Sequence, residues 1–211
     1  MIKNLKYMDI EYTISDLDYI EYISKIIDDE CERIVKFFEL DKYEDKTHVK
    51  LFNDLEEFRK YFKKVHGEEP PKWACGFARD KDVYTLTLNE YKKTKSHEND
   101  NLSALIKLIL HEFVHAVHER RHKNVLVRKW LAEGAATYLS GQYENSNEIN
   151  CTYEQLLEHT SYPNYRAMFA YVLENYGHDY ILKLMDDEEL LKNETERLFE
   201  EACNINHKRV K

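Results

Sequence analysis

Glycine and proline are scarce in this chain, which has five glycines and three prolines among 211 residues. These two residues are the strongest markers of tight turns, so a chain with few of them has few such turns. Lysine and glutamate, which favour helices, are abundant. The composition therefore predicts a mostly helical chain.

Cysteine is also sparse, and its four copies are scattered. Cys31, Cys75, Cys151 and Cys203 form no Cys-x-x-Cys pair and no other spacing typical of metal ligands. We expect them to be packing or surface thiols in a reducing compartment.

Long apolar runs and excess positive charge are both missing. The segment "MIKNLKYMDIEYT" lacks the apolar core of a signal peptide, and no other segment is long and apolar enough for a membrane span. The net charge of −9 argues against nucleic acid as a general partner. We expect a soluble, cytoplasmic protein that does not bind membranes.

The first hundred residues predict strands and helices in alternation. "MDIEYT" and "THVKLF" alternate as strands do, and between them Ser15 is expected to cap a long helix with Asp18 in its first turn. "DLEEFRKYFKKV" predicts a second helix ended by Gly67, and "CGFAR" and "VYTLTL" around "DKD" predict a hairpin. The buried stripe of the long helix is expected to contain Leu17, Ile20, Ile23, Ile27, Ile34 and Phe38.

The rest of the chain predicts helices alone. "NDNLSALIKLILHEFVHAVHERRH" is almost continuously apolar, which predicts a central buried helix capped by Asn101 or Ser103. Further helices are expected in "RKWLAEGAATYLSG", after the Thr152-x-x-Gln155 capping box, up to about Gly177, and in the acidic segment after it. We expect one α+β domain over residues 1–211, in which 1–100 precede the central helix and 123–204 form a helical part.

The central helix carries the order His-Glu-x-x-His, with Glu112 directly after His111 and three residues before His115. Residues four apart on a helix lie about 40° apart around its axis, so both imidazoles can bind one metal ion. Catalytic zinc takes three protein ligands and a water, and Glu112 could take the proton of that water. The alternative is a polar strip, or core histidines satisfied by other hydrogen bonds. We expect His118 not to be a ligand.

Glu133 is the candidate for the third ligand. It lies in "WLAEGAATYL", 18 positions after His115, on a separate predicted helix. A loop through "KNVLV" would let that helix fold back on the first. Gly134 would allow close backbone approach, and Thr137 could hydrogen-bond a ligating side chain.

The paired segments "HEFVH" and "WLAEGAATY" resemble the gluzincin metallopeptidases, in particular the peptidase MA-like domains related to the M1 aminopeptidases. The resemblance implies one zinc ion bound by His111, His115 and Glu133, with Glu112 as general base. It also implies a minimal gluzincin (thermolysin-like) domain, in which a small mixed sheet with an edge hairpin packs on the zinc-binding helix. The interval to Glu133 is one residue shorter than is usual in M1 enzymes, which we attribute to the connecting loop.

The resemblance also implies how substrate is held. In that family an extended peptide pairs antiparallel with a sheet edge before the zinc helix, and an unpaired edge can bind peptide backbone. Gly76 to Arg79, with Gly76, Phe77 and Ala78 as the preferred contacts, and Val83 to Leu88 are both candidates. The resemblance further implies an oxyanion-binding tyrosine, Tyr162 or alternatively Tyr165.

These observations predict a zinc metallopeptidase acting on a peptide or protein substrate. The Gly-x-Met-Glu-Asn segment that grips a free amine in M1 enzymes is missing, which argues against aminopeptidase action. A non-catalytic metal- or peptide-binding module and a zinc hydrolase of another amide or ester are the alternatives. The sequence does not specify the substrate, the cleavage mode or the oligomeric state.

Overall fold

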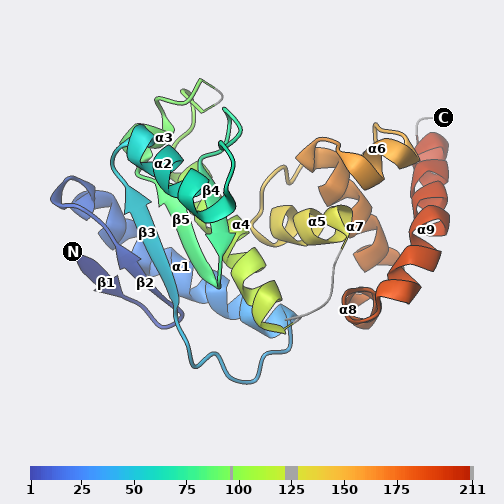
Figure 1. Cartoon of the computed structure of the whole chain (residues 1–211). Coiled ribbons are helices and arrows are strands. Elements are labelled where there is room, and N and C mark those ends of the chain that lie inside the picture. Colours follow the sequence, from blue (N-terminus) through green and yellow to red (C-terminus); the bar gives the residue numbers. More distant parts are fainter. Residues whose placement is uncertain (96, 122–127, 210–211) are drawn as a thin grey trace. The chain divides into compact units, whose positions relative to one another are not determined.

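The chain combines a small mixed sheet with many helices, as the predicted α+β class requires (Figure 1). The computed structural model describes residues 1–95, 97–121 and 128–209. It divides into two compact units, Met1–Glu119 and Arg120–Lys211. The first unit holds the predicted strands, hairpin and most of the central helix, and the second is helical. The single domain expected over 1–211 stays a prediction.

The sheet of the first unit has five strands in the order β1-β2-β3-β5-β4. The strands are β1 (Ile2–Asn4), β2 (Met8–Glu11), β3 (Thr47–Phe52), β4 (Gly76–Arg79) and β5 (Asp82–Leu86). β2, β3 and β5 run parallel, whereas β1 and β4 pair antiparallel with their neighbours. The hairpin strand β4 is therefore an edge of the sheet, and β5 is internal.

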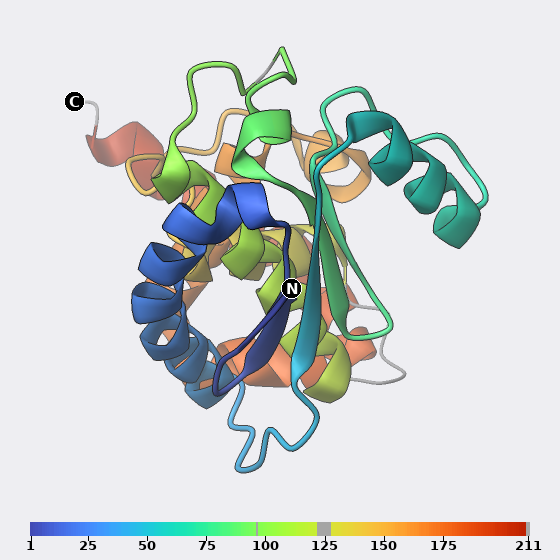
Figure 2. The same ribbon diagram turned by 90° about the vertical axis from the view of Figure 1, so that its left-hand side faces the viewer.

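The two faces of the sheet are covered differently. On one face Ile10, Val49 and Val83 are fully buried, and α1 (Leu17–Phe37) lies along this side, whereas α2 (Leu55–His66) lies on the other (Figure 2). On the α2 face, Phe58 of the helix packs against Phe77 of β4, with ring centroids 5.8 Å apart. The alternation predicted for "THVKLF" is thus confirmed.

The helix α4 (Leu102–Arg121) packs on the same side as α1. Phe38, which follows α1, stacks on the ring of His118 in α4 with centroids 5.6 Å apart. His118 is buried, and the Phe38 ring covers one face of its imidazole. The predicted central helix is confirmed, and so is its cap, because the Asn101 side chain accepts a hydrogen bond from the Ala104 N–H at 3.2 Å.

The start of α1 differs from the prediction. A 3₁₀ turn at Ile14–Asp16 precedes the helix, and Ser15 lies inside this turn rather than at the cap. The buried Asp16 carboxylate accepts hydrogen bonds from the Thr13 N–H at 2.9 Å and the Tyr19 hydroxyl at 2.8 Å. Ser15 as the cap was therefore wrong. Leu17, the first residue of α1, was also wrongly placed in the buried stripe, since it is 38% exposed. The other expected members of the stripe are fully buried: Ile20, Ile23, Ile27, Ile34 and Phe38.

The other helix ends and the hairpin turn follow the prediction. α2 ends at Gly67, whose φ of 79° is in the left-handed region that glycine adopts without strain. Asp80 and Lys81 have positive φ and form the hairpin turn. The reciprocal Thr152–Gln155 capping box opens α6 (Tyr153–Glu158). A short helix, α3 (Leu88–Tyr91), follows the hairpin.

The second unit is built around α5 (Lys129–Leu139) and α7 (Tyr162–Tyr176). α8 (His178–Asp186) and α9 (Glu188–Arg209) complete it, and the buried Trp130 donates a hydrogen bond from α5 to Thr195 in α9 at 3.4 Å. The "KNVLV" loop lies outside the described residues. Among the helices that are described, no stretch has the length and apolar character of a membrane span.

The close contact between α5 and α7 depends on Gly134. A Cβ atom at this position would lie 2.7 Å from the Tyr165 carbonyl oxygen and 2.8 Å from the Phe169 Cβ. Neither atom is the far end of a flexible side chain, so the two helices would have to move apart. The predicted close backbone approach at Gly134 is confirmed.

We expect Gly134→Val to destabilise the protein. Replacing glycine within a helix gains at most about 1 kcal/mol of helix propensity. Overpacking costs about 1–3 kcal/mol, and the two γ-methyl groups of valine place the cost at the upper end. The net loss of unfolding free energy, measured by urea denaturation, should be about 2 kcal/mol. The half-buried Ala132 on the same helix supplies the control Ala132→Ser, and equal stability of both variants would contradict this packing.

Candidate active site

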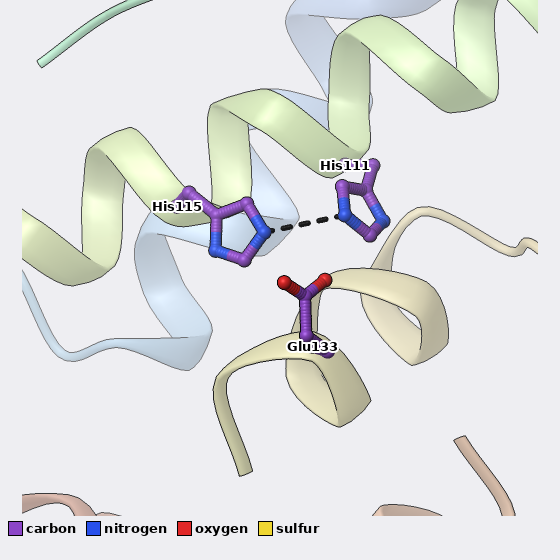
Figure 3. A group of neighbouring side chains, drawn as sticks. All are labelled: His111, His115 and Glu133. Carbon is purple, nitrogen blue, oxygen red and sulfur yellow. Dashed lines mark hydrogen bonds between the residues drawn. The ribbon is translucent and has the colours of Figure 1, made fainter. Parts of the chain in front are cut away.

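The two motif histidines meet on one side of α4. The Nε2 atoms of His111 and His115 are 3.2 Å apart, and Figure 3 shows the two rings turned toward each other from successive turns. His111 is buried and His115 is half-buried. The pair is thus a preformed arrangement of two nitrogen donors.

The spacing of these nitrogens fits zinc. Two nitrogen ligands at the usual zinc distance of about 2.0–2.1 Å and a tetrahedral angle are about 3.3 Å apart. The observed 3.2 Å separation of the His111 and His115 Nε2 atoms is close to this value. Without a metal, one imidazole would donate to the other across the same distance, so the geometry fits both states.

The glutamate between them, Glu112, is buried and faces the sheet. A Cβ atom at Gly76, the first residue of β4, would lie 3.4 Å from Glu112 Oε1 and 3.4 Å from its Cγ. The first residue of the edge strand therefore lies directly beside this carboxylate.

The hairpin pairing shows which main-chain groups face the open edge. The Leu86 N–H donates to the Cys75 carbonyl at 3.1 Å, and the register places Phe77 opposite Tyr84. Because hydrogen-bonded and non-hydrogen-bonded pairs alternate, Phe77 bonds β5, while the N–H and C=O groups of Gly76 and Ala78 point away from it. The structure thus distinguishes the two candidate segments: Gly76–Arg79 forms the edge, and Val83–Leu86 is internal.

In the second unit, Glu133 lies on α5 and is half-buried. Figure 3 draws it with the two histidines, and the third-ligand role expected for Glu133 stays a prediction. The buried Thr137 hydroxyl donates to the main-chain carbonyls of Glu133 at 2.7 Å and Gly134 at 3.1 Å. These bonds hold the turn that carries Glu133, and the predicted contact of Thr137 with a ligating side chain stays a prediction.

The two candidate tyrosines have different surroundings. Tyr165 is 1% exposed, and its hydroxyl accepts a hydrogen bond from the Thr160 N–H at 3.1 Å. Burial raises the pKa of the Tyr165 hydroxyl above its ordinary value, and the negative charge of Glu133 adds to the rise. Tyr162, at the start of α7, is half-buried and more accessible. Accessibility therefore favours Tyr162 as the oxyanion candidate.

Tyr143 is a feature that the sequence did not indicate. Its φ is 51°, an uncommon conformation for a bulky residue, and its ring is parallel to that of Tyr162 within 4°. The loop is held in place because the Ser146 N–H donates to the Tyr143 carbonyl at 2.8 Å, while the buried Arg166 donates to the Ser146 carbonyl at 2.9 Å. A tyrosine in a polar loop has no periodicity to mark it, so sequence patterns could not single it out.

The first unit therefore brings together two nitrogen donors, a buried carboxylate and an open strand edge. The second unit carries the Glu133 carboxylate on α5. The adjacent α7 carries the half-buried Tyr162 and the buried Tyr165. Comparison with known proteins found no matching family model, no matching curated protein and no matching solved structure.

Proposed function

We propose that this protein is a zinc-dependent peptidase of gluzincin type. His111, His115 and Glu133 would hold one zinc ion; their side chains have the donor types that could bind a metal. The observation that carries the proposal is the 3.2 Å histidine pair beside Glu112, which is itself buried against the edge strand. When bound, zinc would polarise the scissile carbonyl and make water a stronger nucleophile.

Glu112 is the proposed general base. Its carboxylate would take the proton from the attacking water and later pass it to the leaving amine. A metal site with a purely structural role needs no such base and is usually closed by four protein ligands. The buried carboxylate next to the histidine pair therefore favours catalysis over a non-catalytic metal- or peptide-binding role.

The open edge of β4 supports a peptide substrate. The outward main-chain groups of Gly76 and Ala78 would pair with an extended peptide, and this pairing does not depend on its side chains. Gly76 would place the scissile bond beside Glu112. A small ester would leave these groups without a role, so the edge favours a peptide over a non-peptide amide or ester. Tyr162 would donate its hydroxyl hydrogen to the developing oxyanion.

Hydrolysis of a mixed peptide library by the purified chain tests the proposal. We expect internal or terminal cleavage that stops when a chelator removes the metal and returns when zinc is added. Cleavage should exceed that of small ester substrates tested in parallel. Activity that resists the chelator, or a zinc-loaded protein that cleaves no peptide, would refute the proposed function.

A further inference from the structure

Two of the four cysteines lie near each other in the second unit. Cys151 precedes α6, Cys203 lies in the C-terminal half of α9, and both are free, half-buried thiols. Cys203 is close enough to Cys151 for a negative charge on the Cys151 sulfur to raise the pKa of the Cys203 thiol. The two residues are 52 positions apart in sequence, so the fold brings them together.

The packing of α6 on α9 accounts for this proximity. The rings of Tyr153 and Phe199 have centroids 5.7 Å apart, and Figure 1 shows α6 beside the C-terminal half of α9. Cys203 lies one turn after Phe199 on the same face of α9, because residues four apart are neighbours on a helix. Cys151 precedes Tyr153 by two residues, which span at most about 7 Å of chain. Both cysteines are therefore adjacent to the same ring contact.

Hydrogen bonds connect the Cys151 segment to the start of α7. The Asn150 N–H donates to the Asn164 side-chain oxygen at 2.7 Å, and the Asn164 amide nitrogen donates to the Thr160 hydroxyl at 2.7 Å. The Thr160 side chain also hydrogen-bonds the Cys151 sulfur. Tyr162, the proposed donor to the oxyanion, lies between Thr160 and Asn164 in the chain. The position of Tyr162 is therefore coupled to that of Cys151.

The surroundings of the two thiols differ. Burial raises the pKa of both thiols above the ordinary value. The hydrogen bond from Thr160 works against this rise at Cys151, whereas the charge of Cys151 adds to it at Cys203. Because the thiolate is the attacking species in disulfide exchange, Cys151 is the expected first nucleophile. Thiols with raised pKa values react slowly at neutral pH, so the pair would respond to sustained oxidation.

We propose that Cys151 and Cys203 form a reversible disulfide that lowers the activity of the oxidised protein. This inference rests on the proposed peptidase function and deepens it by naming a form of regulation. Glutathione disulfide is the proposed oxidant. The Cys151 thiolate attacks one sulfur of the oxidant and releases one glutathione thiolate, and the Cys203 thiolate then displaces the second glutathione from the Cys151 sulfur. The two cysteines lose two electrons and two protons, which convert the glutathione disulfide into two thiols.

The bridge would move the Cys151 segment relative to α9. Both thiols are free in the structure, whereas the sulfur atoms of a disulfide are about 2.05 Å apart. Through Asn150 and Thr160 this movement would shift the start of α7, and Tyr162 with it. Removing one donor to an oxyanion typically costs about a hundredfold to a thousandfold in kcat, so displacing Tyr162 should cost about tenfold or more.

Oxidation of the zinc-loaded protein by glutathione disulfide, followed by removal of the glutathione, tests the bridge. Fragments from digestion without reductant should include one cross-linked pair that carries Cys151 and Cys203. The kcat for peptide hydrolysis should fall about tenfold or more, and a phosphine reductant should restore it. The Tm should rise by several degrees, because the bridge closes a loop of the unfolded chain.

Cys203→Ala removes one partner and leaves the contacts of Cys151 in place. This variant should match the wild type before oxidation, form no cross-link and keep its activity after oxidation. Cys31 is fully buried in α1 of the first unit, so Cys31→Ala is the matched control. It should form the cross-link and lose activity as the wild type does.

The outcomes separate regulation from catalysis. Absence of the cross-link, or equal activity of reduced and oxidised wild type, would overturn the proposal and leave the peptidase intact. An equal loss of activity in Cys203→Ala would also overturn it, because a glutathione attached to Cys151 would then be the cause. If the reduced wild type cleaves no peptide, the proposed function fails, while the cross-linked fragments and the rise in Tm still decide whether the bridge forms. A cross-link together with a loss of activity that reduction reverses supports the proposal.

Discussion

Replacing Glu112 with glutamine should lower peptide hydrolysis by about a hundredfold to ten-thousandfold, the usual contribution of a positioned general base. Glutamine has nearly the same shape as glutamate and should occupy the same space against Gly76. It cannot accept the proton of the attacking water. Steady-state measurement of kcat and KM should therefore show a large loss of kcat with little change in KM.

The same helix offers a matched control for this substitution. Glu119 is exposed on α4, seven residues after Glu112, so Glu119→Gln makes the same chemical change outside the proposed site. We expect its kcat/KM to equal that of wild type, and both variants to bind zinc. An active Glu112→Gln variant would contradict the role of Glu112 as the base.

Zinc should stabilise the folded protein strongly, and His115→Ala should abolish that effect. A ligand that binds only the folded state stabilises it by about 4 kcal/mol when present at a thousand times its Kd. For a chain of this size each kcal/mol raises Tm by about 2–4 °C, so zinc should raise the wild-type Tm by about 8–16 °C. Losing one of the two nitrogen donors should weaken zinc binding at least about a hundredfold. Residues that only hydrogen-bond a metal ligand already contribute about 10–100-fold to metal affinity, and a ligand itself contributes more.

Thermal denaturation with and without zinc measures this difference. His48→Ala removes a partly exposed histidine on the sheet, far from the motif in sequence, and should respond to zinc as the wild type does. An equal rise in Tm for His115→Ala and wild type would show that zinc binds elsewhere on the chain.

The sequence predicts those helix ends that depend only on residues close to one another in the chain. The Asn101 cap, the Thr152–Gln155 capping box and Gly67 each satisfy backbone groups through neighbours in sequence, so their patterns are sufficient. The start of α1 was misplaced because Ser15 and Asp16 are both good capping residues. In the structure α1 begins at Leu17, directly after Asp16. Asp16 also accepts a hydrogen bond from the Tyr19 hydroxyl, and no capping pattern predicts that contact.

Contacts between distant residues account for what the sequence left open. Both hairpin segments alternate as strands do, and only the pairing of β5 with β3 shows that β4 is the edge. The approach of Gly76 to Glu112 joins residues 36 positions apart, which no local pattern encodes. Gly134 was predictable because a glycine inside a helix already suggests a close neighbour. Tyr143 was not, because its unusual φ is set by the turn around it.

Zinc content tests the central claim most directly, with wild type and Glu133→Gln analysed side by side after exposure to zinc and removal of unbound metal. We predict about one zinc ion per wild-type chain, and a large loss in the variant, whose neutral amide is a poor zinc ligand. Zinc-free wild type would contradict the metal site altogether. Full zinc content in Glu133→Gln would contradict the assignment of Glu133 as the third ligand.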